Sequence, residues 1–319
     1  MSSDRPPLRS LLFVPGNRTD WLVKARAAGA DAAILDLEDA VPSAGKTAAR
    51  EEVARAIAGA SGDTAQGTGE SGDTAPGAGG VAGAAGGMAL FVRVNPLDGW
   101  GGAEDLRAVA RAGLAGVVLP KVAGPADVIV ADRLLTWCER ENGLPEGHIA
   151  LVPLLESAAA LRGAYEIAGA ASRVAYLGAV TGKGGDVEQA VGYRWTPGGA
   201  ETLALRSRVL LDVRAAGVPC PVAGLWTPIA DLDGLRSFAE QNRALGYEGM
   251  MAIHPSHVPV INEVFSPTAE ELDRYERMIA AVEHAQAAGA GAVTFEGDMV
   301  DEAMAARARA ALRRARRSN

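Results

Sequence analysis

Carboxylates stand directly after short apolar runs at several points in the sequence. Asp36, Glu38 and Asp39 follow one run, Glu156 follows another, and Asp186 ends a glycine-rich turn after a third. These side chains offer oxygen ligands, which suit a hard cation such as Mg²⁺ that takes one or two protein carboxylates and keeps several waters. Taken singly, each carboxylate is more typical of a helix cap than of a catalytic group.

Basic side chains follow neighbouring runs. Arg93 ends the third apolar run and Lys121 follows the fourth. A cation at either place suits an anionic substrate. Asn95, two residues after Arg93, adds an amide at the same point. Together with the carboxylates, these residues predict a polar site that handles a negatively charged small molecule.

Two other patterns resemble known motifs but do not match them. The turn 178–185 is one residue short of a P-loop, and Gly184 stands where Ser or Thr would coordinate magnesium. Its backbone N–H groups can still hold a carboxylate or a phosphate. His254 and His257 have Pro255 between them and no third nitrogen ligand nearby in sequence, which favours capping or packing over metal binding.

Eight short apolar runs, most of them followed by a segment with helical spacing, would position these side chains. This alternation is typical of a parallel sheet covered by helices, and eight runs favour closure into a (β/α)₈ TIM barrel of the α/β class. An open doubly wound sheet is the alternative. In a barrel, catalytic groups lie at the carboxyl ends of strands. The runs are 9–14, 32–37, 90–94, 116–120, 149–155, 174–178, 222–226 and 250–253.

The chain divides into a predicted barrel domain, 1–265, and a C-terminal helical arm, 266–319. Residues 59–87 are almost entirely Gly, Ala, Ser, Thr and Asp, and we expect a flexible surface insertion there. In the arm, Thr268 and Glu271 form a capping-box pattern for a helix reaching about Ala287. A basic helix over 303–317 closes the chain. An arm beyond a complete barrel suggests a lid over a site or packing on a neighbouring subunit.

Composition narrows the class of protein. The net charge of −8 argues against a nucleic-acid partner. Apolar residues make up 48% of the chain, enough for a large core without disulfides. Cys138 and Cys220 stand alone and are expected to be reduced thiols. No apolar segment is long enough for a signal peptide or a membrane span. We therefore expect a soluble cytoplasmic enzyme.

Five ordered motifs identify a family resemblance. The chain resembles the citrate lyase β-subunit-like proteins of the aldolase/citrate lyase superfamily, which are magnesium-dependent CoA-ester lyases. The resemblance runs from Arg9 to about Leu312, interrupted by the insertion. The motifs are Arg-Ser-Leu-Leu-Phe-Val-Pro-Gly at 9–16, Leu-Asp-Leu-Glu-Asp-Ala at 35–40, Val-Arg-Val-Asn at 92–95, Leu-Pro-Lys-Val at 119–122 and Ile-His-Pro at 253–255.

The resemblance implies roles for particular residues. It implies a (β/α)₈ barrel in which Glu156 and Asp186 hold Mg²⁺ and Arg93 binds the substrate. It also implies that an Asp from the arm of an adjacent subunit covers the site; Asp301 fits this best and Asp298 is the fallback. Glu38 is counted with Arg93 and Asp301 as catalytic. The residues expected to contact the substrate or CoA are Arg9, Lys46, Arg93, Pro120 and Lys121.

The expected reaction is retro-Claisen cleavage of a 3-hydroxyacyl-CoA, such as malyl-, citramalyl- or citryl-CoA, to acetyl-CoA and a 2-oxo acid. Within the family, a malyl-CoA thioesterase, a malate-synthase-like enzyme or a citrate lyase subunit acting on a carrier thioester are alternatives. Outside it, the alternatives are a non-catalytic interaction barrel and a sugar-phosphate-binding barrel. A subunit-shared site implies an oligomer, expected to be a homotrimer or hexamer. The chain departs from the family in the longer loop before Asp186, where Glu188 is a substitute ligand candidate.

Overall fold

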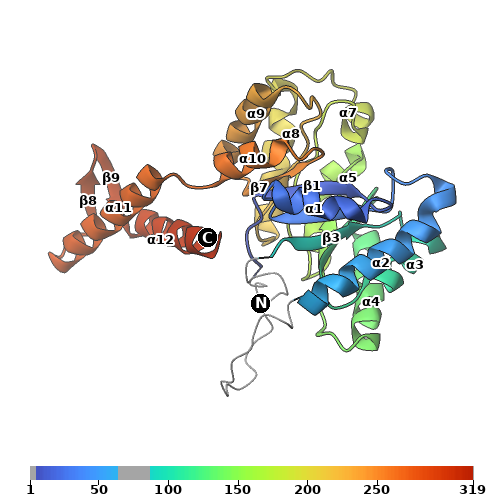
Figure 1. The fold of residues 1–319 in the computed structure, drawn as a ribbon. Coiled ribbons are helices and arrows are strands. Elements are labelled where there is room, and N and C mark those ends of the chain that lie inside the picture. Colours follow the sequence, from blue (N-terminus) through green and yellow to red (C-terminus); the bar gives the residue numbers. More distant parts are fainter. Residues whose placement is uncertain (1–4, 64–86, 319) are drawn as a thin grey trace, which may run out of the picture. The chain divides into compact units, whose positions relative to one another are not determined.

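Seven parallel strands form one curled sheet in the order β5-β4-β3-β2-β1-β7-β6. Figure 1 shows helices surrounding this sheet. The structure is a computed structural model that describes residues 5–63 and 87–318. Both faces of β2 and β4 are buried, as expected for a parallel sheet enclosed by helices. The strands are β1 (Ser10–Pro15), β2 (Ala32–Asp36), β3 (Ala89–Arg93), β4 (Leu114–Leu119), β5 (Ala150–Pro153), β6 (Val222–Ala223) and β7 (Gly249–Ala252).

An irregular segment, 173–181, fills the eighth place between β5 and β6. The prediction of a regular strand over 174–178 is wrong, since only isolated parallel bridges form there, Leu151 with Val174 and Val180 with Gly224. On one side, Ala175 N donates to the Leu151 carbonyl at 2.9 Å; on the other, Gly224 N donates to the Ala179 carbonyl at 3.2 Å. These bonds close the ring, so the TIM-barrel-like fold predicted from the sequence is confirmed.

Close approach of two backbones explains why this segment is irregular and glycine-containing. A Cβ atom on Gly178 would lie 1.8 Å from the Val222 carbonyl oxygen, so no other residue fits there. Tyr176 has a positive φ of 57° and packs edge-to-face against Phe91, with ring centroids 5.6 Å apart. The bend turns Tyr176 into the barrel interior, where it fills the core with Phe91 and Met251.

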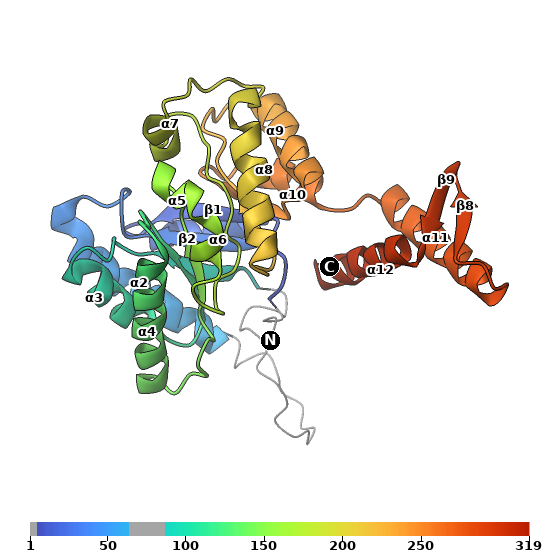
Figure 2. The ribbon, with the colours of Figure 1, turned by 180° about the vertical axis from the view of Figure 1, so that it is seen from behind.

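Helices cover the outside of the sheet. Figures 1 and 2 show α2, α3 and α4 side by side on one flank and α8, α9 and α10 on another. Short 3₁₀ turns lie at Thr19–Trp21 and Ser43–Gly45. The helices are α1 (Leu22–Ala27), α2 (Lys46–Asp63), α3 (Trp100–Val109), α4 (Pro125–Glu141), α5 (Ala158–Arg162), α6 (Ala164–Ala168), α7 (Asp186–Val191), α8 (Ala200–Ala215), α9 (Leu232–Leu245) and α10 (His257–Phe265).

The flexible loop expected at 59–87 is wrong for its first residues. Helix α2 continues to Asp63, so the first five residues of the predicted loop are helical. Residues 64–86 lie outside the described residues. Within the described part of the chain, no helix is both long enough and apolar enough to span a membrane.

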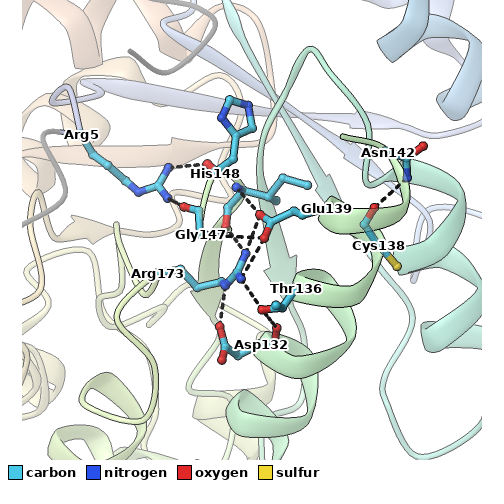
Figure 3. A network of polar contacts seen from close by, with 10 residues as sticks. Arg5, Asp132, Thr136, Cys138, Glu139, Asn142, Gly147, His148 and Arg173 are labelled. Carbon is cyan, nitrogen blue, oxygen red and sulfur yellow. Dashed lines mark hydrogen bonds and ion pairs between the residues drawn. The ribbon is translucent and has the colours of Figure 1, made fainter. Parts of the chain in front are cut away.

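A buried polar network lies at the amino ends of the strands (Figure 3). We call Arg5, Asp132, Thr136, Glu139 and Arg173 the base network. The Glu139 carboxylate is fully buried and accepts from both Nη atoms of Arg173, at 2.7 and 3.0 Å. It also accepts from two backbone N–H groups, those of Gly147 and Ile149. Arg5 donates to the carbonyls of Gly147 and His148, which ties the N-terminal segment to the β5 entrance.

The C-terminal residues form a second compact unit, 264–319, separate from unit 1–263. Its first helix, α11 (Ala269–Ala287), begins at the Thr268–Glu271 capping box, as predicted. An antiparallel hairpin of β8 (Ala292–Phe295) and β9 (Asp298–Asp301) follows, where a purely helical arm was expected. The last helix is α12 (Glu302–Ser318). Its small core consists of Met278, Val282, Val300, Ala305 and Ala308.

Candidate active site

The site is built around an ion pair between the ends of two neighbouring strands. Asp36 and Arg93 are register partners at the carboxyl ends of β2 and β3. The Arg93 Nε and Nη2 atoms donate to the two Asp36 carboxylate oxygens at 2.8 and 2.7 Å. Asp36 also accepts from the backbone N–H groups of Glu38 and Ala40. This bidentate pairing fixes the guanidinium plane, which is 5.1 Å from the Phe13 ring centroid.

Glu38 is held between two cations. One of its oxygens lies 3.1 Å from Arg93 Nη1 and the other 2.8 Å from Lys121 Nζ. The side chain is only 3% exposed, yet neither oxygen receives a well-directed hydrogen bond. Burial raises the pKa of Glu38, against the opposing effects of Lys121 and Arg93. Arg93 Nη1 and Lys121 Nζ are therefore oriented by charge, and their N–H groups remain able to bind a substrate anion.

Neighbouring carboxylates raise the pKa of both cations, Arg93 and Lys121. Burial alone would lower the pKa of Arg93, but the hydrogen bonds to Asp36 and the charges of Glu38 and Asp39 raise it. The close ion pair with Glu38 raises the pKa of Lys121, and the charge of Asp186 adds to it. Both side chains therefore stay cationic at neutral pH.

Glu156 and Asp186 face the same rim. Glu156 follows β5, and among the described residues its carboxylate receives one hydrogen bond, 2.8 Å from the backbone N–H of Lys121. Lys121 has a positive φ of 51°, which turns its N–H toward Glu156 while its ammonium reaches Glu38. Burial raises the pKa of Glu156 to about 6, and the negative charges of Glu38 and Asp186 contribute. Asp186 is the exposed first residue of α7.

The rim therefore holds more negative than positive charge. We call it the rim cluster: Asp36, Glu38, Asp39, Arg93, Lys121, Glu156 and Asp186. Five carboxylates face two cations, and burial, together with the negative charges of Glu38 and Asp186, raises the pKa of Glu156. No group of three or more His, Cys, Asp or Glu side chains within the described residues is arranged to hold a metal. A donor set of two carboxylates, with water completing the shell, fits Mg²⁺.

Lys46 lies beside this rim. At the start of α2, its ammonium donates to the side-chain oxygen of Asn95, two residues beyond the end of β3. Asn95 is fixed in turn by Asp105, which accepts from its backbone and side-chain N–H groups at 2.9 and 2.6 Å. Pro120 joins β4 to Lys121. Asp105 and Phe13 support the site without having been predicted; the alternation of residues along β1 is the signal that places Phe13 inward.

Arg9 is not brought to this rim. It precedes β1 and pairs with Asp31, which precedes β2, so both lie at the amino ends of the strands. The Arg9 Nε and Nη2 atoms lie 2.9 and 2.7 Å from the two Asp31 oxygens. Arg9, which the sequence assigned to CoA binding, therefore lies at the opposite end of the barrel from every other predicted site residue in this unit.

Asp301 belongs to the second unit. It ends β9, and one carboxylate oxygen accepts from the backbone N–H of Met304 at 3.1 Å, so it caps the start of α12. Asp298, at the start of β9, is exposed. The catalytic role implied for Asp301 stays a prediction.

Backbone hydrogen bonds hold Glu188, and its role as a substitute metal ligand stays a prediction. Its two oxygens accept from the backbone N–H groups of Gly184, at 2.6 Å, and Trp195, at 2.9 Å. These bonds lower the pKa of Glu188. The glycine-rich turn thus holds an anion, as its backbone suggested, but the anion is the chain's own carboxylate. His257 is fully buried and His254 Nδ1 lies 2.7 Å from Ser256 Oγ, consistent with packing and turn roles.

Charged side chains gathered at the carboxyl ends of barrel strands are typical of the active site of a barrel enzyme. Residues 9–67 and 81–255 match the family described as HpcH/HpaI aldolase/citrate lyase. The chain belongs to that family, and it is a lyase of the citrate lyase β-like, CoA-ester lyase type.

Relatives and solved structures agree with this placement. A citrate lyase subunit beta-like protein of Deinococcus radiodurans is 37% identical, covering 96% of this chain and 98% of its own. A (3S)-malyl-CoA thioesterase of Cereibacter sphaeroides is 32% identical, over 99% and 97%. The crystal structure of CitE from Mycobacterium tuberculosis in complex with magnesium, acetoacetate and coenzyme A has a TM-score of 0.68 at 28% identity. It covers 97% of this chain and 98% of its own.

Proposed function

We propose that this protein cleaves a 3-hydroxyacyl-CoA, such as malyl-, citramalyl- or citryl-CoA, to acetyl-CoA and a 2-oxo acid, with Glu156 and Asp186 holding Mg²⁺. The rim cluster carries the proposal, because it combines an excess of carboxylates with an immobilised arginine. Magnesium and coenzyme A bound to the M. tuberculosis relative support the same choice of cofactor and substrate class.

In the proposed cleavage the substrate hydroxyl loses its proton and the bond between C2 and C3 of the acyl group breaks. The electron pair of that bond passes to the thioester as an enolate, and a proton then returns to C2. Magnesium, when bound, would supply Lewis acidity to the substrate's hydroxyl and carboxylate oxygens. Glu38 is a buried carboxylate with a raised pKa between Arg93 and Lys121, which suits it to accept the hydroxyl proton.

Arg93 is proposed to bind the oxyanion that develops during cleavage. Its Nε and Nη2 atoms are committed to Asp36, so the guanidinium cannot rotate, while Nη1 has no well-directed bond. A preorganised donor of this kind stabilises developing charge without reorganisation. Lys46 and Lys121 are proposed to bind the phosphate or carboxylate groups of the CoA thioester. Asp301 of an adjacent subunit, in a homotrimer or hexamer, would deliver the proton to C2.

The test is to incubate the protein with Mg²⁺ and each of the three CoA esters, measuring acetyl-CoA, free CoA and the 2-oxo acid together. The proposal expects acetyl-CoA and one oxo acid to appear in equal amounts, and EDTA to abolish both. Arg93→Lys keeps the charge but loses the bidentate geometry, so kcat/KM should fall about 10²–10³-fold. Arg236, which makes an equally bidentate pair with the exposed Glu263, supplies the control Arg236→Lys.

A malyl-CoA thioesterase is the second candidate, favoured by the relatives of that name that cover nearly the whole chain. Hydrolysis needs the same acidic rim and differs in releasing free CoA. Free CoA without an oxo acid would replace the lyase assignment with this one. No turnover of any of the three esters would contradict both.

A further inference from the structure

We propose that Glu188 is the positioning residue for Asp186: its carboxylate clamps the segment carrying Asp186 and sets the metal site before a cation binds. The inference rests on the proposed function, because it takes Asp186 as a metal ligand. It assigns to Glu188 an indirect role, exerted through the backbone on either side of Asp186.

The clamp closes a loop around α7. Glu188 Oε2 accepts from Gly184 N, two residues before Asp186, and Oε1 accepts from Trp195 N, nine residues after it. Helix α7 has only six residues between Gly185 and Gly192, and Gly192 ends it in the left-handed conformation. A helix this short is marginal by itself. Its direction, and that of the Asp186 side chain, must come from contacts outside the helix.

The far end of the clamp is anchored to the barrel. The Trp195 ring packs edge-on against Trp226, with centroids 5.3 Å apart, and Trp226 is only 1% exposed. The Trp226 indole N–H donates to the Asp231 carbonyl at 2.9 Å. On the near side, Thr181 N donates to the Gly224 carbonyl at 3.3 Å. Glu188 therefore connects the turn before Asp186 to a fixed part of the wall.

Directed hydrogen bonds to both carboxylate oxygens distinguish Glu188 from the two glutamates of the rim cluster, Glu38 and Glu156. Each oxygen accepts a hydrogen bond from a backbone N–H, so the carboxylate fixes the conformation of the loop. Residues that orient metal ligands in this indirect way change metal affinity by about 10–100-fold when they are removed. The longer connection before Asp186 thus carries its own brace within α7.

Glu201 provides a matched control. Its carboxylate also holds the backbone of the segment that follows α7, accepting from Thr196 N and Thr196 Oγ1, each at 2.7 Å. The Glu201 carboxylate has no hydrogen bond or ion pair with the turn that carries Asp186 among the described contacts. Removing it tests the general stability of the segment, and removing Glu188 tests the link to Asp186.

The experiment measures binding of Mn²⁺ alone, without substrate, to the full chain by calorimetry and by the EPR signal of free Mn²⁺. Glu188→Ala should raise the Kd about 10–100-fold. Glu188→Gln, which retains one acceptor oxygen, should recover part of the loss. Glu201→Ala should stay within about twofold of wild type, and Glu156→Gln should raise the Kd at least about 100-fold. Thermal unfolding checks that each variant is folded. If Glu188→Ala is not folded, the Mn²⁺ Kd of Glu188→Gln is compared with that of Glu201→Gln instead.

Two failures can be told apart. Unchanged Mn²⁺ binding in Glu156→Gln would overturn the proposed metal site and the inference with it. Loss of binding in Glu156→Gln combined with a wild-type Kd in both Glu188 variants would overturn only the positioning role. An equal loss in the Glu188 and Glu201 variants would also overturn it, since the effect would then belong to the segment as a whole.

Discussion

The two ends of the barrel carry similar charged side chains, but the carboxylates are fully paired at one end and incompletely paired at the other. In the base network, Asp132 and Glu139 face Arg173 and Arg5, and Glu139 receives four hydrogen bonds. In the rim cluster, carboxylates outnumber cations, Glu38 lacks a well-directed hydrogen bond and Glu156 receives only one. A buried charge that is fully paired contributes to the integrity of the fold, and one left under-compensated is available to a ligand.

The largest effect is expected at the base network. Glu139→Ala leaves the Arg173 guanidinium, 2% exposed, with a single carboxylate partner, Asp132, and leaves two backbone N–H groups without an acceptor. The free energy of unfolding should fall by about 3–5 kcal/mol, measured by urea denaturation. The folded fraction should bind Mn²⁺ with the wild-type Kd. A variant of normal stability would mean that the paired end is not structural, which would break the comparison.

The rim should respond in the opposite way. Glu156→Gln removes one of the two proposed metal ligands, so the Mg²⁺ Kd should rise at least about 100-fold. Its stability at pH 8 should equal or exceed that of wild type, because the ionised Glu156 carboxylate is disfavoured by burial. Asp127→Asn, at a half-buried carboxylate that accepts from the backbone N–H of Ala123 outside the site, is the control for removing one charge. If Glu156→Gln is less stable than wild type and still binds Mg²⁺ normally, Glu156 stabilises the fold and does not bind the metal.

What the sequence could predict follows the same division. Strand-end residues such as Asp36, Arg93 and Glu156 were predictable, because parallel strands deliver their carboxyl ends to one rim whatever the details of packing. The closing segment at 173–181 was not, because its bend depends on the close approach of Gly178 to Val222. The bonds of Arg173 to Glu139 and of Glu188 to Trp195 depend on side-chain directions that periodicity does not encode. Arg9 belongs to a motif that includes strand β1, but it lies at the amino end of that strand, so its role in CoA binding stays a prediction.

Metal binding should depend on pH near 6. A proton and a cation compete for the Glu156 carboxylate, whose pKa is raised from 4.5 to about 6. Below that value the protonated form dominates, so the Mg²⁺ affinity should fall about tenfold per pH unit, and above it the affinity should level off. Calorimetry from pH 5 to 8 checks this. A Mg²⁺ affinity that stays constant from pH 8 down to about pH 5 would show that Glu156 is an ordinary carboxyl. That result would contradict the raised pKa of Glu156.

The smallest effect is expected at Arg9, which tests whether location or motif decides function. Arg9→Ala removes a partly exposed ion pair with Asp31, so stability should fall by about 0.5–1 kcal/mol. The KM for the CoA ester should change less than about twofold, because Arg9 lies at the amino ends of the strands, whereas substrates bind at the carboxyl ends. Lys46→Ala, at the rim, should raise the same KM several-fold more. A rise in KM for Arg9→Ala matching that of Lys46→Ala would show that the thioester is contacted from both ends, and the division between a structural base and a functional rim would then fail.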